Sequence, residues 1–433
     1  MSETISIHLD VPYELKPIYR HLFEVWAFHF AVQVVFKDDT ASFTVSSTEG
    51  AHLKLSREAL LAMKRQDFDW LRGNFTHLGF KIPESEKVDH VTTALFMLNY
   101  LQEYSAQQYD DLGRFPFELS YQNRYSSSKQ DLVSFHFDRI ANAMDLDLHR
   151  KNDASRIFVS HDIDEVNSAF LENGLYALKQ GRIDILLNLV FNQLMGNPQW
   201  LNMTRIMDVN DEYGIKSTFF WLVNKKRAQL GNYKLRNADY KISNKKIRKS
   251  ISNVADRSFE NGLHKGIAGD SFASELKALD SHVIANRNHF LKLKLPDHFR
   301  QIDEAGLQLD FSLGFAEQYG FRNSYSKPIH PFDLLQNHSV KALFVPLHIM
   351  DTTNWIYKKE SLNSMKTEVL SFIESNKQDA VLSLLWHNKY FSGLKFNGYL
   401  EIYKSILDYC QSAEIKGITQ SEILEKYQYN HTD

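Results

Sequence analysis

The pattern of hydrophobic and polar residues divides the chain into two regions with different rhythms. In the first region, an alternating run rich in β-branched and aromatic residues predicts a strand at Phe28–Phe36. Longer apolar or amphipathic runs predict three helices, at Leu55–Gly73, Val88–Tyr104 and Leu132–Met144. A short polar stretch, Asp145–Ala154, then separates this region from the rest of the chain, as linkers between domains do.

After this stretch, strand-like and helix-like patterns alternate. Short buried-type runs predict strands at Arg156–Ser160, Ser217–Val223, Lys341–Leu347 and Ala380–Leu385. Helices are expected at Trp200–Tyr213, Ile247–Asn261, Phe272–Ala285, Leu362–Asn376 and Tyr399–Ser412. Repeated alternation of this kind predicts a parallel sheet, either open or closed into a barrel. We therefore expect an α/β protein with a smaller α/β domain over residues 1–150 and a larger domain over residues 151–433.

The composition agrees with two folded domains and restricts the chemistry. The 433 residues exceed the ~250–300 that one hydrophobic core usually supports, and 43% of them are hydrophobic. The single cysteine, Cys410, excludes an intrachain disulfide and a cysteine-based zinc site, so His and carboxylate side chains would have to hold any metal. A net charge of -3 argues against a nucleic-acid-binding protein, which would normally be basic.

The sequence contains no recognisable export signal or membrane span. Its first residues lack a basic region followed by an apolar core. The most apolar early stretch, Leu22–Phe36, is interrupted by polar side chains, whereas a spanning helix needs about 20 largely apolar residues. We expect a soluble, cytoplasmic protein.

One segment departs from the otherwise even distribution of charge. Lys225–Lys249 is strongly basic, with the runs KKR and KKIRK. Such a segment is usually a solvated loop and helix face, and the alternative is a site for an acidic substrate or a phosphate.

Three polar clusters follow predicted strands or lie on the loops between elements, which is where active residues collect in parallel α/β folds. The first cluster is His161–Asp164 (HDID), directly after a predicted strand. Its two carboxylates, at i and i+2, point to the same side if the strand continues. Because close like charges repel, a metal or an arginine would stabilise the pair. A surface turn that caps a helix is the alternative.

The other two clusters contain histidines. Asn261–His264 (NGLH) is typical of a short strand that ends at a close backbone approach, and Arg287–His289 (RNH) follows it. The third cluster, Trp386–Asn388 (WHN), comes directly after a predicted strand. Taken singly, such histidines are more often structural, but the three clusters in this order form a specific combination that favours metal or acid–base chemistry.

In this order the segments resemble the polysaccharide deacetylase family, also called the NodB-homology or carbohydrate esterase family 4 superfamily. The matching stretches are VSHDID, YGIKSTFFW, ENGLH, RNHF, LQLDFSLGF with YGFRNS, and LLWHN. They are most similar to a bacterial subgroup with an additional N-terminal domain, whose pattern is matched here by LFMLNYLQEY and then GRF. The resemblance implies a distorted (β/α) barrel of NodB type with fewer strands than the usual eight, preceded by the smaller α/β domain.

Carried over position by position, the resemblance implies catalytic roles for four residues. Asp162 would be the general base, and Arg287 would be the arginine that pairs with it. His387 would be the general acid, and Asp310 would be the acidic residue that orients this histidine.

The resemblance also implies a divalent metal. Asp164 and His264 match two of the family's ligands. The family's second metal histidine has no counterpart, because Ile267 and Ala268 occupy its positions, and His289 is the candidate in its place. Hard oxygen and imidazole ligands suit zinc, with cobalt or nickel as alternatives.

The implied activity is metal-dependent removal of acetyl groups, N- or O-linked, from a carbohydrate or polysaccharide. Two other interpretations stay open: a degenerate, non-catalytic member that binds carbohydrate or acts as a scaffold, and a metal-free amidohydrolase. Aromatic residues that could stack on sugar rings, but are more often core, are Phe311, Phe315, Tyr319 and Trp386.

Overall fold

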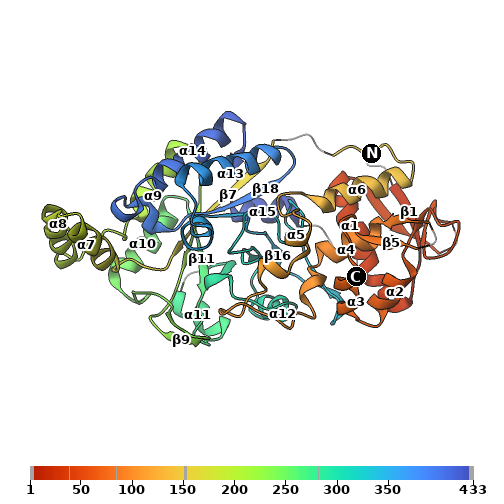
Figure 1. Ribbon diagram of the computed structural model, residues 1–433, viewed down its shortest axis with the longest axis horizontal. Helices are drawn as coiled ribbons and strands as arrows, with labels where there is room; N and C mark the ends of the chain where they lie inside the picture. The colour runs from red at the N-terminus through yellow and green to blue at the C-terminus, as the bar shows by residue number, and fades with distance from the viewer. Residues whose placement is uncertain (1–3, 39, 84, 151–153, 281, 429–433) are drawn as a thin grey trace.

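A parallel sheet of nine strands forms the centre of the C-terminal region (Figure 1). The computed structural model describes residues 4–38, 40–83, 85–150, 154–280 and 282–428. Eight strands lie in the order β16-β13-β12-β11-β8-β7-β18-β17, and β19 also pairs with β7. Their bounds are β7 (Arg156–Ile163), β8 (Thr218–Trp221), β11 (Glu260–Lys265), β12 (Ala285–Asn288), β13 (Leu309–Asp310), β16 (Leu343–Phe344), β17 (Ile349–Met350), β18 (Val381–Leu385) and β19 (Lys416–Gly417).

Every pairing between these strands is parallel, so the α/β fold class predicted from the alternating pattern is confirmed. The sheet is a curled half-barrel, and its two outermost strands, β16 and β17, do not pair with each other in the described part of the chain. Strand β7 is buried along almost its whole length, as a parallel strand covered on both faces should be.

Helices connect and cover these strands. Local sequence explains several of their ends: the Ser361 side chain accepts a hydrogen bond from the Ser364 N–H at the start of one helix, and Thr419 and Glu422 form a capping box at another. The helices of this region are α7 (Ala169–Lys179), α8 (Ile183–Leu194), α9 (Met203–Glu212), α10 (Lys245–Asp256), α11 (Phe272–Leu279), α12 (Asp297–Glu304), α13 (Leu362–Ser375), α14 (Tyr399–Ser412) and α15 (Gln420–Tyr427).

The first region has its own four-stranded parallel sheet, in the order β2-β1-β3-β4, and a group of helices beside it (Figure 1). The strands are β1 (Thr4–Asp10), β2 (Gln33–Phe36), β3 (Phe43–Ser46) and β4 (Leu53–Lys54), with a separate pair, β5 (Phe80–Ile82) and β6 (Lys87–Asp89). The helices are α1 (Lys16–Phe30), α2 (Arg57–Lys64), α3 (Phe68–Asn74), α4 (His90–Leu98), α5 (Tyr121–Arg124) and α6 (Leu132–Ala143).

The two regions pack against each other. One hydrophobic core extends from the first sheet and its helices to side chains between residues 293 and 344. A buried ion pair also joins them: the Arg322 guanidinium donates to both carboxylate oxygens of Glu103, at 2.9 and 2.7 Å. Arg322 and Glu103 are 2% and 3% exposed, so neither charge is solvated by bulk water. The predicted division at residue 150 stays a prediction.

Some predicted elements have different bounds in the structure. The first four residues of the predicted strand Phe28–Phe36 are not extended, because α1 continues to Phe30 and ends at Ala31, which has a φ of 57°. The predicted helix Leu55–Gly73 is two helices, since Gln66 has a φ of 56° and Asp67 caps the second. In both cases one left-handed residue interrupts a run whose apolar pattern is continuous.

Among the described residues, no helix is long and apolar enough to cross a membrane.

The ion pair between the regions gives a prediction about stability. Glu103→Gln should lower the free energy of unfolding by about 3–5 kcal/mol, because the Arg322 charge would stay buried without a counter-charge. Glu212→Gln is the matched control: its partner is Lys404, both side chains are exposed, and we expect a loss of about 0–1 kcal/mol. Denaturant-induced unfolding of both variants measures the difference, and equal losses would contradict the assigned role of the buried pair.

Candidate active site

The carboxyl ends of four strands bring the predicted site residues together. Asp162 lies near the end of β7, His264 near the end of β11 and Arg287 near the end of β12. His387 follows the end of β18 by two residues. Because all of these strands are parallel, their carboxyl ends lie at one edge of the sheet, and its curl brings non-adjacent strands within hydrogen-bonding distance.

Asp164 is the centre of a cluster of imidazoles. Its Oδ1 lies 3.2 Å from His264 Nε2, and its Oδ2 lies 3.7 Å from His289 Nε2. Donor atoms of these three residues all lie within 4.8 Å of one another, and both histidines are buried. A donor atom of His289 therefore lies in the same cluster as those of Asp164 and His264.

The donor set and its spacing fit a divalent metal ion. A tetrahedral ion with bonds of about 2.0–2.1 Å would hold its ligand atoms about 3.4 Å apart. The 3.2 and 3.7 Å contacts of Asp164 are near this value, and they involve its two different oxygens, one for each histidine. His264 Nδ1 donates to the Arg287 carbonyl oxygen at 2.8 Å, so in the neutral imidazole the Nε2 lone pair faces the cluster. His289 Nδ1 is buried and has no hydrogen-bond partner among the described residues, so this ring is oriented by the contact of Nε2 with Asp164 and by stacking on Phe290.

Mutual charge compensation shifts the pKa values of the cluster. Burial by itself would raise the pKa of the Asp164 carboxyl, but His289, His264 and His387 hold it well below its usual range. Burial would lower the pKa of His264, and the carboxylates of Asp162 and Asp164 reverse this and raise it. For His289 burial dominates, and its pKa is lowered. The cluster thus combines an ionised carboxylate with one imidazole that favours the neutral form.

Asp162 lies beside this cluster and has a counter-charge of its own. Arg287 Nη1 donates to Asp162 Oδ1 at 2.9 Å and to the Ser160 hydroxyl at 2.8 Å, while Arg287 Nε donates to the Phe311 carbonyl oxygen at 3.2 Å. Arg287 is completely buried, and its guanidinium lies over the Phe220 ring, 4.5 Å from the centroid. The second oxygen of Asp162 lies 3.5 Å from His264 Nε2, so this oxygen faces the candidate metal site.

His387 is oriented by Asp351, which corrects the prediction that Asp310 has this role. His387 Nδ1 lies 2.7 Å from Asp351 Oδ1, and the His387 backbone N–H donates to the other oxygen. His387 Nε2 lies 3.6 Å from Asp164 Oδ2 and therefore points into the site. Burial lowers the pKa of His387, but the Asp351 carboxylate more than offsets this and raises it to about 9.

Asp310 has a structural role instead. It accepts hydrogen bonds from Asn286 Nδ2 at 2.7 Å and from the Ser312 N–H at 2.9 Å, and His298 Nε2 lies 3.2 Å away. These partners hold the end of β13 against β12, so Asp310 supports the strand that carries Arg287. Sequence reasoning missed Asp351 because it follows β17, a strand of only two residues that gives no periodic signal.

The other members of the predicted clusters are structural. His161 Nδ1 donates to the Trp386 carbonyl oxygen at 2.7 Å, and burial lowers its pKa to about 3. A Cβ on Gly262 would lie 2.5 Å from the Phe220 ring, which explains the glycine in the second cluster as the expected close approach. The aromatic residues considered for sugar stacking are all core residues, with exposures of at most 4%: Phe311, Phe315, Tyr319 and Trp386.

The first region supports the loop that carries His289. Arg114, in the GRF stretch, is 5% exposed and donates to the Phe290 carbonyl oxygen at 3.1 Å. It also donates to the Asp110 carboxylate at 2.7 Å and to the Tyr357 hydroxyl at 3.0 Å. Phe290 has a φ of 59°, so the chain turns sharply directly after His289, and the Arg114 hydrogen bond holds this turn.

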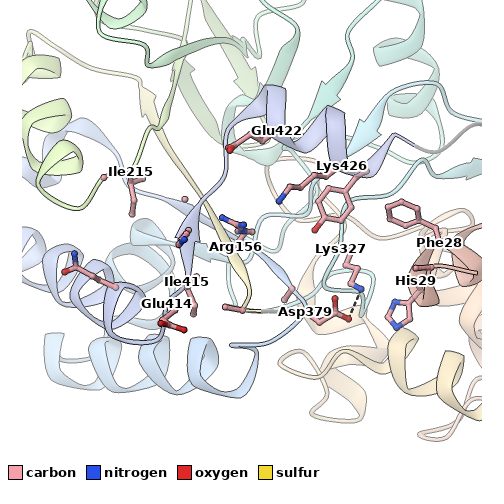
Figure 2. Close-up of a pocket in the computed structure, with 18 of the residues that line it drawn as sticks. Phe28, His29, Arg156, Ile215, Lys327, Asp379, Glu414, Ile415, Glu422 and Lys426 are labelled. Atoms are coloured by element: carbon pink, nitrogen blue, oxygen red, sulfur yellow. Dashed lines mark hydrogen bonds and ion pairs between the residues drawn. The ribbon is translucent and has the colours of Figure 1, made fainter. Parts of the chain in front are cut away.

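A cavity of about 1260 Å³ lies elsewhere, between α1, the beginning of β7 and α15 (Figure 2). Arg156, Lys426 and the ion pair between Lys327 and Asp379 line it. It opens at the amino end of β7, whereas the candidate catalytic residues lie at the carboxyl end, and none of them lines the cavity.

No family model and no curated protein matches the chain. Solved structures are similar to somewhat less than two thirds of the chain. One from Mycobacterium smegmatis, described as a polysaccharide deacetylase, has 11% identity and a TM-score of 0.37 over 65% of this chain and 95% of that chain. A polysaccharide deacetylase from Bacillus cereus has 9% identity and a TM-score of 0.31 over 62% and 93%. A CE4-family pseudoenzyme from Bacillus anthracis has 10% identity and a TM-score of 0.28 over 64% and 68%.

Proposed function

We propose that this protein is a metal-dependent hydrolase that removes acetyl groups, N- or O-linked, from a carbohydrate or polysaccharide. The observation that carries the proposal is the juxtaposition of three groups at one edge of the sheet. These groups are an Asp–His–His cluster, a carboxylate paired with a buried arginine, and a histidine paired with a buried carboxylate.

In this proposal Asp164, His264 and His289 hold the metal. A bound divalent ion, which we expect to be zinc, with cobalt or nickel as alternatives, would polarise the acetyl carbonyl and lower the pKa of a water molecule. The absence of cysteine ligands and the mixed oxygen and nitrogen donors support this choice.

Asp162 is proposed as the general base. Arg287 binds only one of its two carboxylate oxygens, at 2.9 Å, so the other oxygen is available to accept a proton. The oxygen that does not bind Arg287 lies beside His264 and so faces the position where a water molecule would be activated. The base and the candidate metal site are thus adjacent without sharing an oxygen atom.

His387 is proposed as the general acid. Because Nδ1 is bound to Asp351, the proton available for transfer is on Nε2, which points into the site. A pKa raised to about 9 keeps the imidazole protonated at neutral pH. His387 can therefore donate a proton to the leaving nitrogen or oxygen as the bond to the acetyl group breaks.

The role of the base can be tested with Asp162→Asn. This variant keeps the shape of the side chain but cannot accept the proton, and we expect turnover on an acetylated oligosaccharide to fall by roughly 10²–10⁴. Metal content and the circular dichroism spectrum should match those of the unchanged protein. A rate equal to that of the unchanged protein would rule out Asp162 as the base.

The role of His387 is tested by comparing two leaving groups. An amine leaves only if it is protonated, whereas a nitrophenolate leaves without help, so His387→Ala should impair amide cleavage at least about tenfold more than cleavage of an activated aryl acetate. Similar losses on both substrates would indicate a role in binding or structure.

Metal dependence is tested by elemental analysis of the purified protein. We expect about one equivalent of zinc per chain in the unchanged protein and much less in His264→Ala and His289→Ala. His338→Ala is the control: this histidine is exposed and is not among the candidate ligands, so the variant protein should keep its metal. Acetate release from acetylated oligosaccharides after chelation, with no metal present, would favour the metal-free amidohydrolase. Neither metal nor acetate release would favour the non-catalytic member.

A further inference from the structure

Helices α7 and α8 form a hairpin that projects from the end of the molecule opposite the first region (Figure 1). The two helices pack mainly against each other, and the hairpin begins a few residues after Asp164 at the end of β7. Nothing in the proposed chemistry uses it.

The hairpin exposes an unusual number of large apolar side chains. Leu187 and Phe191 are each 63% exposed, and Leu194 is 81% exposed. Single exposed apolar residues are normal on a protein surface, whereas a group of them on one element marks an interaction surface. The exposed large apolar residues of the hairpin are Leu171, Leu175, Tyr176, Leu178, Ile183, Leu187, Phe191, Leu194 and Met195.

These side chains form stripes rather than a random scatter. On α7, Leu171, Leu175 and Leu178 recur at intervals of four and three residues, so they share one face of the helix. On α8, Ile183, Leu187 and Phe191 recur at intervals of four, with Leu194 three residues further on. The residues that α7 buries, such as Ala169 and Ala177, lie on a different face from its apolar stripe. On α8 the buried residue is Leu189, which is not part of the stripe.

The basic segment Lys225–Lys249 is attached to the base of this hairpin. Arg236 donates to the Ser168 hydroxyl, at 3.2 Å, just before α7 begins. Lys246 donates to the Met195 carbonyl oxygen at 3.4 Å and to Asn197 Oδ1 at 3.1 Å, just after α8 ends. The basic segment is therefore hydrogen-bonded to both ends of the hairpin, just before α7 and just after α8.

The charge of this segment is largely uncompensated. It contains ten Lys or Arg residues and one acidic residue, Asp239, in a chain whose net charge is -3. Six of its cations are exposed and form no ion pair with any carboxylate in the described part of the chain: Lys225, Arg227, Lys234, Lys241, Lys245 and Lys249.

We propose that this hairpin and the basic segment Lys225–Lys249 dock on an anionic lipid surface, with the apolar stripes inserted among the headgroups and the cations beside lipid phosphates. Apolar helices that lie in a membrane interface bind through buried apolar area plus electrostatic attraction to anionic lipids, and both features occur here together. The described helices are too short or too polar to span the bilayer, so the contact is peripheral.

A second copy of this chain is the competing occupant of the apolar face. Packing two hairpins against each other would bring two strongly basic segments close together, and like charges across an interface oppose association. An anionic lipid surface meets the same cations with opposite charge, so the charge distribution favours the membrane.

Sedimentation of the full-length protein with lipid vesicles tests the proposal without any substrate. We expect binding to vesicles that contain phosphatidylglycerol, little binding to pure phosphatidylcholine, and release at high salt. Replacing both Leu187 and Phe191 by Ser should weaken binding to the anionic vesicles by about tenfold or more. The double variant Lys245→Gln, Lys249→Gln should also weaken it, without changing the apolar face.

Two controls make the result specific. Leu61→Ser with Leu78→Ser removes exposed leucines from the first region, 38% and 46% exposed, and should leave vesicle binding unchanged. Asp162→Asn should bind vesicles normally, so that failure of docking and failure of the proposed hydrolysis are distinguished.

Three results would overturn the proposal: no binding of the unchanged protein to anionic vesicles, equal binding by the hairpin variant, or binding that is insensitive to salt and to the lysine changes. A dimer in sedimentation velocity that the Leu187 and Phe191 changes dissociate, without vesicle binding, would assign the apolar face to a second copy.

Discussion

Two carboxylates, Asp162 near the end of β7 and Asp164 directly after it, impose the constraint on which the rest of the site depends. Asp162 and Asp164 can both be ionised next to each other only if each has its own counter-charge. Arg287 supplies it to the first, and the imidazoles of His264 and His289 surround the second. These partners come from two other strand ends, so the electrostatic requirement of β7 determines which side chains the neighbouring strands must carry.

Hydrogen bonds and an ion pair that involve the first region hold loops near the site in place. The turn after His289 is held by Arg114, and Arg322 donates to the Gly314 carbonyl oxygen while it is paired with Glu103. Both sets of interactions connect the first region to loops at the carboxyl edge of the large sheet. That region therefore contributes to the geometry of the site without providing any of its donor atoms.

Much of the candidate site was predictable, because the short motifs HDID, NGLH, RNH and WHN occur in an order that resembles a known family. His264 and Arg287 lie near the ends of β11 and β12, His387 follows β18, and the structure brings them together with Asp162 and Asp164. The exception is instructive: Asp310 also lies at a strand end, but it faces His298 and Asn286 rather than His387. Which of several strand-end carboxylates meets a given histidine depends on the order of the strands, and this order is not the order of the sequence.

The sequence by itself determined the alternation of strands and helices, the burial of the central strands and the chemical types at their ends, since these depend on local hydrophobic periodicity. Only the tertiary structure decided that residues 125 positions apart, Asp162 and Arg287, form an ion pair. It also decided that Asp351, after a two-residue strand, orients His387. The reason is that β7 lies between β8 and β18, so pairing distant strands in a curled sheet, rather than any local preference, brings their side chains together.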